Sequence, residues 1–226
     1  MIKCPSIKIL ALLLLSIKLQ AQQADTTFWT SYYGQKETLF RLLPDTKGEI
    51  IFLGNSITDI GEWAEIWQNL KVKNRGISGD NTFGVLARLD EVVSSKPAKI
   101  FLMIGINDIA RNTPGEVIES NYEKILQRIK AASSKTKVYV QSILPTNDAF
   151  TEFKRHQGKD VQIRALNQQL EMLAQKHGYT YVDLYSVFLD AEGKMDKQYT
   201  NDGLHINGYG YMKWKEVLEQ KGYCCK

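Results

Sequence analysis

The sequence predicts a single-domain α/β protein in which a five-stranded parallel sheet lies between two layers of helices. Two observations lead to this prediction. Five apolar runs of strand length are spread along the chain, and the segments between them carry apolar residues at a spacing of three and four. Apolar strands that alternate with helices are typical of a parallel sheet covered on both faces. Five such strands indicate a flavodoxin-like three-layer sandwich.

The elements follow one another in a regular order. The strands are expected in the runs EIIFLG, VKNRGI, KIFLMIG, KVYVQSIL and YTYVDLY, which begin at Glu49, Val72, Lys99, Lys137 and Tyr179. Helices are expected around the apolar stripes within 85–93, 117–129, 163–174 and 211–218. The polar stretch from 145 to 160 is predicted to be a long loop, and such loops are often functional.

Two smaller predictions concern the helices. His177 and Gly178 mark the C-terminus of the third helix, where a basic side chain and a glycine are both favourable. Tyr209 and Trp214 are interpreted as core residues of the last helix.

Residues 1–21 have the form of a secretory signal peptide. Lys3 and Lys8 give a basic start, an apolar run covers 9–17, and small residues near Ala21 resemble a cleavage site. The apolar run is short for a membrane span, although an uncleaved anchor is the alternative. We therefore expect a signal peptide at 1–21, a lead-in segment at 22–48, one domain at 49–226, and a periplasmic or secreted protein without stable membrane insertion.

Charge and cysteine content narrow the function classes. The chain has 29 basic and 25 acidic side chains, and without the three lysines of residues 1–21 the balance is 26 to 25. This balance does not indicate a nucleic-acid partner. Cys4 lies in the predicted signal peptide. Cys224 and Cys225 are adjacent at the C-terminus, where they can form a strained ring or pair with another molecule, so their role stays open. No cysteine spacing indicates a metal.

Three polar clusters follow apolar strands and a fourth precedes the last helix, and all four are expected at one edge of the sheet. They are Gly54-Asn55-Ser56, NRGISGD at 74–80, GIND at 105–108 and NDGLH at 201–205. Each cluster alone is ordinary turn material. In a parallel sheet, however, the carboxyl ends of the strands meet at the edge where ligands bind. Together the clusters therefore predict an active site.

The residue types in these clusters suit acyl transfer. Ser56 is the candidate nucleophile, His205 its base, and Asp202 the carboxylate that orients the imidazole. The backbone N–H groups of Ser56 and Gly79 and the side chain of Asn107 are the candidate oxyanion hole. No metal or other cofactor is expected.

The remaining histidines have other interpretations. His177 closes a helix, and His156 lies in the long polar loop without a nearby carboxylate, so we expect it to be a solvated surface residue. The serine also does not occupy the G-x-S-x-G motif of α/β-hydrolases, because Thr58 stands where the second glycine should be.

The four blocks GNSIT, NRGISGD, GIND and DGLH resemble those of SGNH hydrolases, the GDSL-type esterase/lipase superfamily, from about Glu49 to about Leu218. The resemblance implies that Ser56, Gly79, Asn107 and His205 are the name-giving residues and that Asp202 completes the triad. Asn55 stands where many members have Asp, and it can make the same turn.

The resemblance also implies a function. It is that of a serine esterase that removes short acyl groups, acetyl above all, from carbohydrate through an acyl-serine intermediate, as sialate and polysaccharide O-acetylesterases do. A lysophospholipase or thioesterase is the alternative, and it would need a wide apolar acyl groove. The oligomeric state and the alcohol part of the substrate stay open.

Two other classes of function fit these residues less well. Five side chains could in principle ligate a divalent ion, namely Asp59, Asp80, Asp108, Asp202 and His205. That scheme would leave Ser56 and Asn107 without roles. A catalytically inactive carbohydrate-binding protein is disfavoured because all five residues for acyl transfer are present.

The polar neighbours of these residues have a structural interpretation. Asn55, Asp80 and Asp108 are expected to cap helix starts or to join loops, since Asp and Asn favour such positions.

Overall fold

The computed structural model describes residues 25–223, so the predicted signal peptide and the two C-terminal cysteines lie outside the described residues. The five expected strands form one sheet in the order β2-β1-β3-β4-β5, and every neighbouring pair is parallel. The strands are β1 Ile50–Gly54, β2 Val72–Gly76, β3 Lys99–Met103, β4 Lys137–Gln141 and β5 Thr180–Val182. This order confirms the flavodoxin-like topology.

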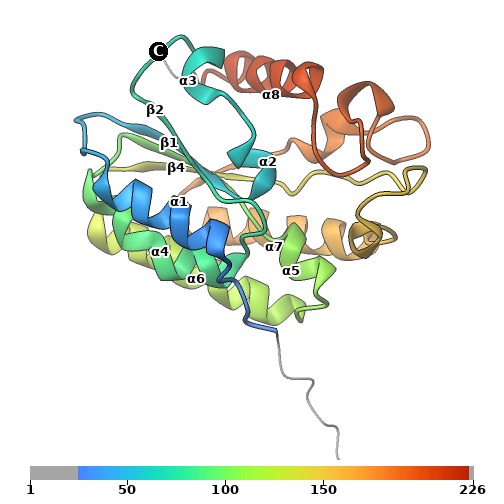
Figure 1. Cartoon of the computed structure of the whole chain (residues 1–226), viewed down its shortest axis with the longest axis horizontal. Coiled ribbons are helices and arrows are strands. Elements are labelled where there is room, and N and C mark those ends of the chain that lie inside the picture. Colours follow the sequence, from blue (N-terminus) through green and yellow to red (C-terminus); the bar gives the residue numbers. More distant parts are fainter. Residues whose placement is uncertain (1–24, 224–226) are drawn as a thin grey trace, which may run out of the picture.

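Two layers of helices cover the sheet. The helices are α1 Ser31–Leu42, α2 Ser56–Asp59, α3 Trp63–Ile66, α4 Thr82–Ser94, α5 Ile106–Ala110, α6 Gly115–Ala132, α7 Asp160–His177 and α8 Gly208–Gln220. In Figure 1, α1, α4, α6 and α7 lie on one face of the sheet, and α3 and α8 lie on the other. Three short 3₁₀ helices, Lys154–His156, Tyr185–Phe188 and Lys197–Tyr199, lie in the later loops.

The last strand is shorter than the run that predicted it. The chain leaves the sheet after Val182, and the backbone N–H groups of Leu184 and Tyr185 donate to the hydroxyl of Ser142, at 2.8 and 2.7 Å. The hydroxyl of Ser142, which directly follows β4, thus takes the place of the strand-to-strand hydrogen bonds, and the chain continues into a 3₁₀ helix.

Aromatic side chains fill the space between the sheet and α8. The rings of Phe52 and Trp63 stack at 3.9 Å, and the indole of Trp214 meets Trp63 edge-on at 4.8 Å. Trp214 is fully buried, as predicted, but Tyr209 is 77% exposed, so its prediction as a core residue is wrong. The two lie five residues apart on one helix, about 140° around its axis, and therefore face different ways.

The segment before β1 contains a helix that the sequence pattern did not predict. Helix α1 buries Tyr33 and Phe40 against Ile77, and the hydroxyl of Tyr33 donates to the carbonyl of Gly84 at 2.8 Å. It lies beside α4 as part of the same layer (Figure 1). Within residues 25–223 no helix has the length and apolar character that a membrane crossing requires.

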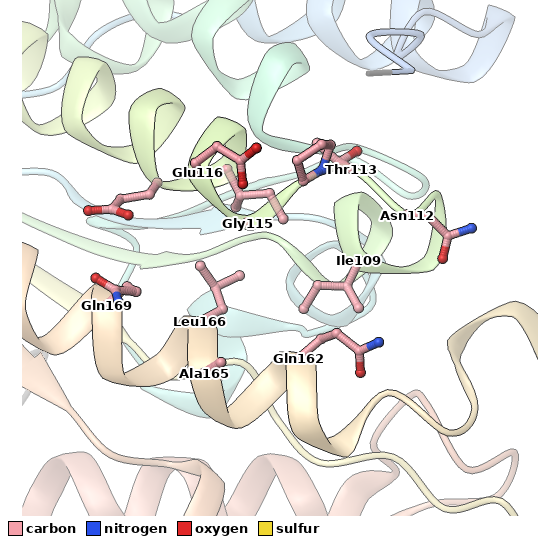
Figure 2. A pocket seen from close by; sticks show the side chains of 12 residues that line it. Ile109, Asn112, Thr113, Gly115, Glu116, Gln162, Ala165, Leu166 and Gln169 are labelled. Carbon is pink, nitrogen blue, oxygen red and sulfur yellow. The ribbon is translucent and has the colours of Figure 1, made fainter. Parts of the chain in front are cut away.

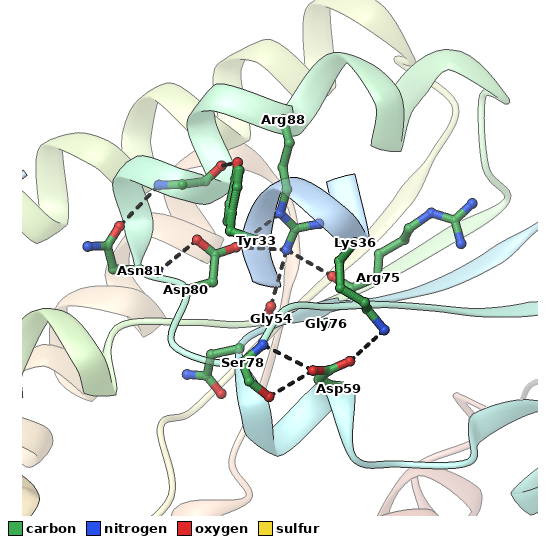
Figure 3. A network of polar contacts seen from close by, with 12 residues as sticks. Tyr33, Lys36, Gly54, Asp59, Arg75, Gly76, Ser78, Asp80, Asn81 and Arg88 are labelled. Atoms are coloured by element: carbon green, nitrogen blue, oxygen red, sulfur yellow. Dashed lines mark hydrogen bonds and ion pairs between the residues drawn. The ribbon is translucent and has the colours of Figure 1, made fainter. Parts of the chain in front are cut away.

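A buried ion pair joins the ends of β1 and β2 to α4. Arg88 Nη2 lies 2.9 Å from Asp80 Oδ2, with the two side chains 1% and 0% exposed. The same nitrogen donates to the carbonyls of Gly54, at 3.2 Å, and Arg75, at 2.9 Å (Figure 3). Burial raises the pKa of Asp80 to about 6 despite the attraction of Arg88, so the carboxylate is ionised at neutral pH. One guanidinium thus hydrogen-bonds to backbone carbonyls near the ends of two strands.

We predict that Asp80→Asn lowers the free energy of unfolding by about 3–5 kcal/mol, because it leaves a buried guanidinium without a counter-charge. Urea unfolding monitored by circular dichroism measures the loss. Asp90→Asn is the matched control: its carboxylate is 79% exposed beside Arg128, and we expect a change below about 1 kcal/mol. Equal losses in the two variants would contradict the role given to the buried pair.

Candidate active site

The close approach of β1 and α2 explains the glycine that ends the strand. A Cβ on Gly54 would overlap Thr58 Oγ1 and the carbonyl oxygen of Met103. Asn55 then caps α2, and its side chain accepts from the N–H of Ile57 at 3.0 Å, which confirms its predicted capping role. Ser56 is the first residue of α2, so this tight turn fixes its hydroxyl at the edge of the sheet.

The loop before α8 brings a histidine and a carboxylate to Ser56. His205 Nε2 lies 2.9 Å from Ser56 Oγ, and His205 Nδ1 lies 2.7 Å from Asp202 Oδ2. Asp202 Oδ1 also accepts from the backbone N–H groups of Leu204 and His205, both at 2.8 Å. The three predicted residues therefore form one chain of hydrogen bonds.

The charge of Asp202 fixes the tautomer of His205. Burial opposes ionisation of this carboxyl, but hydrogen bonds from the Leu204 N–H, the His205 ring and the His205 N–H outweigh it and lower its pKa. An ionised carboxylate accepts the proton on Nδ1. The lone pair of Nε2 is then directed at the serine hydroxyl.

The three candidate oxyanion donors lie beside this hydroxyl. Ser56, Gly79 and Asn107 line one cavity of about 400 Å³ together with Ile60, Ser78, Phe153, His156, Leu204 and His205. Within residues 25–223 the backbone N–H groups of Ser56 and Gly79 have no hydrogen-bond partner. Asn107 Nδ2 uses one hydrogen on the carbonyl of Asp80, at 2.8 Å, and keeps the other. The cavity therefore holds a hydroxyl, a base and three N–H donors.

Asp59 fixes the loop that carries Gly79. Its Oδ2 accepts from the N–H and the hydroxyl of Ser78, at 3.1 and 2.7 Å, and from the hydroxyl of Tyr32, at 2.8 Å. Lys36 Nζ lies 2.7 Å from Oδ1 (Figure 3). Burial opposes ionisation, but the bonds from Lys36, Ser78 and Tyr32 outweigh it and lower the pKa of Asp59. Lys36 and Tyr32 of α1 are thus connected to the loop with Gly79 through the carboxylate of Asp59.

Asp108, on α5, bonds the start of α4, one of the two roles predicted for it. Its carboxylate accepts from the N–H of Thr82, at 3.1 and 3.2 Å, and from the Thr82 hydroxyl at 2.5 Å. Burial raises its pKa to about 6. The carboxylates considered for a metal thus have separate partners, and no group of three or more metal-ligating side chains gathers within the described residues.

The prediction for His156 is wrong. Instead of standing in solvent, its half-buried ring points into the cavity, and Nε2 lies 2.9 Å from Asn107 Oδ1. Its partner is 49 residues away in the sequence, so no local pattern could have revealed the contact. His177 closes α7 as expected and lies 3.0 Å from Glu123.

A second cavity, of about 470 Å³, lies between α5, α6 and α7 (Figure 2). It is lined by aliphatic, amide and carboxylate side chains, among them Ile109, Leu166 and Glu116, and it shares no residue with the cavity at Ser56. Helix α5 separates the two, since Asn107 lines one and Ile109 the other. No serine, cysteine or histidine lines the second cavity, so it holds no candidate nucleophile–histidine pair.

Comparison with known proteins identifies the family. Residues 52–213 match the GDSL-like lipase/acylhydrolase family, and the chain belongs to it. The chain is 27% identical over 183 residues to platelet-activating factor acetylhydrolase IB subunit alpha2 of Rattus norvegicus. The match covers 78% of this chain and 76% of the rat protein. The protein is therefore a GDSL-type esterase or acylhydrolase, as its four sequence blocks predicted.

Solved structures agree with this assignment. A GDSL-like lipase from Bacteroides thetaiotaomicron is 28% identical, with a TM-score of 0.72, and the match covers 84% of this chain and 96% of that one. An acetylxylan esterase from Geobacillus stearothermophilus, solved as a catalytic mutant, is 17% identical, with a TM-score of 0.63 and coverage of 79% and 96%. The latter similarity establishes the fold alone.

We predict that Gly79→Ala lowers the free energy of unfolding by about 1–2 kcal/mol, because φ is +82° there and an L residue is strained in that region. No atom lies within 4 Å of the added Cβ, so the loss reports backbone strain and not a clash. Gly115→Ala is the control, since it also has free space, lacks a positive φ and opens α6. It should be neutral or stabilising by up to about 1 kcal/mol. Urea unfolding compares the two, and an unchanged stability of Gly79→Ala would contradict the strain.

Proposed function

We propose that the protein is a serine esterase that hydrolyses short-chain esters, in particular O-acetyl groups on carbohydrate, through an acyl-Ser56 intermediate. The observation that carries the proposal is the hydrogen-bonded chain from Asp202 through His205 to Ser56, which ends beside three N–H donors. A hydroxyl, a base, an orienting carboxylate and an oxyanion hole are the parts that acyl transfer needs.

The reaction begins when the ester carbonyl oxygen lies among the N–H groups of Ser56, Gly79 and Asn107. As Ser56 Oγ forms a bond to the carbonyl carbon, its proton passes to His205 Nε2. The developing oxyanion is stabilised by the three donors, each typically worth about 2.7–4 kcal/mol in the transition state. His205 then returns the proton to the leaving alcohol oxygen as the ester C–O bond breaks.

The second half of the reaction uses the same groups. A water molecule gives its proton to His205 Nε2 and its oxygen attacks the acyl carbon. The bond to Ser56 Oγ breaks, the proton returns to the serine, and the acid is released. Asp202 keeps the imidazolium in place in both halves without itself taking the proton.

In this proposal the acyl group lies against the side chain of Phe153, which limits its length. The ring of Phe153 lies edge-on to His205, at 4.8 Å between centroids, and Ile60 and Leu204 line the same space. The larger cavity behind α5 is separated from Ser56. Phe153 adopts a positive φ of 50°, which is unusual for an aromatic residue and is found where surrounding structure enforces it.

The acetyl and carbohydrate parts of the proposal are suggested by the names of similar proteins. The rat relative is named as an acetylhydrolase and the Geobacillus structure as an acetylxylan esterase, and both names concern acetyl esters. A signal peptide at 1–21 would place the enzyme where extracellular polysaccharide lies. Release of acetate from acetylated xylo-oligosaccharides, with deacetylated oligosaccharide as the blank, tests the carbohydrate part.

We predict that Ser56→Ala abolishes hydrolysis of p-nitrophenyl acetate, with a loss in kcat on the order of 10⁶. The unfolding midpoint should stay nearly unchanged, since the hydroxyl bonds only His205 within the described residues. Ser186→Ala, at an exposed serine far along the chain, is the control and should retain wild-type activity. A variant without Ser56 that keeps a tenth of the turnover would contradict the acyl-serine intermediate.

We predict that kcat/KM for p-nitrophenyl acetate exceeds that for the octanoate by at least about tenfold, because a longer chain meets the wall of Phe153. A panel of esters from acetate to palmitate measures this preference. Phe153→Ala should raise the octanoate-to-acetate ratio by widening the cavity. Preference of the wild type for octanoate or longer chains would favour a lysophospholipase or thioesterase.

A further inference from the structure

The long loop between β4 and α7 places a histidine against one of the oxyanion donors. His156 Nε2 lies 2.9 Å from Asn107 Oδ1, and the same amide donates from Nδ2 to the carbonyl of Asp80 at 2.8 Å. We propose that His156 is a positioning residue of the esterase: its Nε2–H holds the amide of Asn107 in the orientation that points the free Nδ2 hydrogen at the oxyanion. The inference rests on the proposed function, in which Asn107 is an oxyanion donor.

The orientation of the amide follows from its two partners. The Asp80 carbonyl can only accept, so the atom of Asn107 that faces it must be the nitrogen. The oxygen of Asn107 then faces His156, and only a protonated Nε2 can donate to it. The opposite amide orientation would set two acceptors, the amide oxygen and the Asp80 carbonyl, against each other. The contact therefore has a defined donor and acceptor.

The protonation of the ring agrees with this assignment. Burial is the largest cause that lowers the pKa of His156; the nearby backbone carbonyl of Phe153 raises it, and the charges of His205 and Arg155 lower it further. A neutral ring carries one N–H. Within the described residues His156 Nδ1 is buried without a partner, which suits an unprotonated nitrogen. A neutral His156 also adds no positive charge beside His205 when His205 accepts the serine proton.

The loop that carries His156 is held at several points. The N–H of His156 donates to the carbonyl of Phe153 at 2.8 Å, within the 3₁₀ turn Lys154–His156. Gln157 Nε2 donates to the carbonyls of Phe150 and Glu152, at 2.6 and 3.0 Å. These contacts fix the ring beside the amide.

The same loop is also connected to the turn that carries Lys194 and to the start of α7. Lys194 joins Asp148 and Asp160, at 2.8 and 2.5 Å. The N–H of Gly158 donates to Asp148 Oδ1 at 3.0 Å. A side chain fixed in this way can restrict the rotation of its partner, and a hydrogen bond to the amide oxygen also strengthens the amide N–H as a donor.

His156→Met and His156→Gln form the matched pair that tests the inference. The two side chains have similar length, but only glutamine can donate to Asn107 Oδ1. On p-nitrophenyl acetate we expect His156→Met to lower kcat by about tenfold or more with KM changed less than about twofold, since the lost stabilisation is confined to the transition state. His156→Gln should recover most of kcat. Equal losses for Met and Gln, or an effect on KM alone, would overturn the positioning role.

A double-mutant cycle with Asn107→Ala provides the second measurement. Loss of the Asn107 donor should cost about 10²–10³ in kcat. In that background, His156→Met should change kcat by less than about twofold, because nothing remains to position. Multiplication of the two single effects would overturn the inference. Unfolding midpoints confirm that each variant is folded, and His156→Leu, which also cannot donate to Asn107 Oδ1, serves for the cycle if His156→Met does not fold.

The Ser56→Ala variant in the same assay separates this inference from the proposed function. Hydrolysis that does not depend on Ser56 would remove the proposed function and the positioning role together. Hydrolysis that depends on Ser56, with equal losses for His156→Met and His156→Gln, would remove only the role of His156.

Discussion

The buried pair of Arg88 and Asp80 is the interaction on which the geometry of the site depends. The Arg88 guanidinium donates to the last carbonyl of β1, at Gly54, and to the Arg75 carbonyl of β2, so it fixes where both strands end. Asp80 faces two ways: its carboxylate holds Arg88, and its backbone carbonyl accepts from Asn107. The buried ion pair is therefore linked, through Asp80, to Asn107, one of the candidate oxyanion donors.

The turn with His205 is anchored to the loop with His156. The N–H of Asn147 donates to the carbonyl of Gly203 at 2.9 Å, and Asn147 Nδ2 donates to the carbonyl of Met195 at 2.7 Å. The residues that transfer protons thus lie on the same connected set of loops as the residues that stabilise the oxyanion. Rigid placement of such groups before the substrate arrives is what makes electrostatic stabilisation effective.

Strand runs and site blocks were predictable because their causes are local. An apolar run predicts a strand wherever it occurs, and Ser56, Gly79, Asn107, Asp202 and His205 lie in short blocks at strand ends or before a helix. Helix α1 was not predictable in this way, since it buries only Tyr33 and Phe40 and its contacts to α4 are distant in sequence. His156 was misinterpreted for the same reason: its partner lies on α5. Tyr209 was misplaced because a helix assignment does not fix which face is covered.

The tie between α1 and Asp59 has a consequence for where this enzyme begins. The family match starts at residue 52, yet Lys36 and Tyr32 hold the carboxylate that fixes Ser78, next to Gly79. Tyr33 and Phe40 also cover Ile77, which directly follows β2. The recognisable motifs are thus shorter than the unit that shapes the oxyanion loop. A truncation at the first motif would remove α1. It would expose the apolar residues that α1 covers and take away the side chains that hold Asp59.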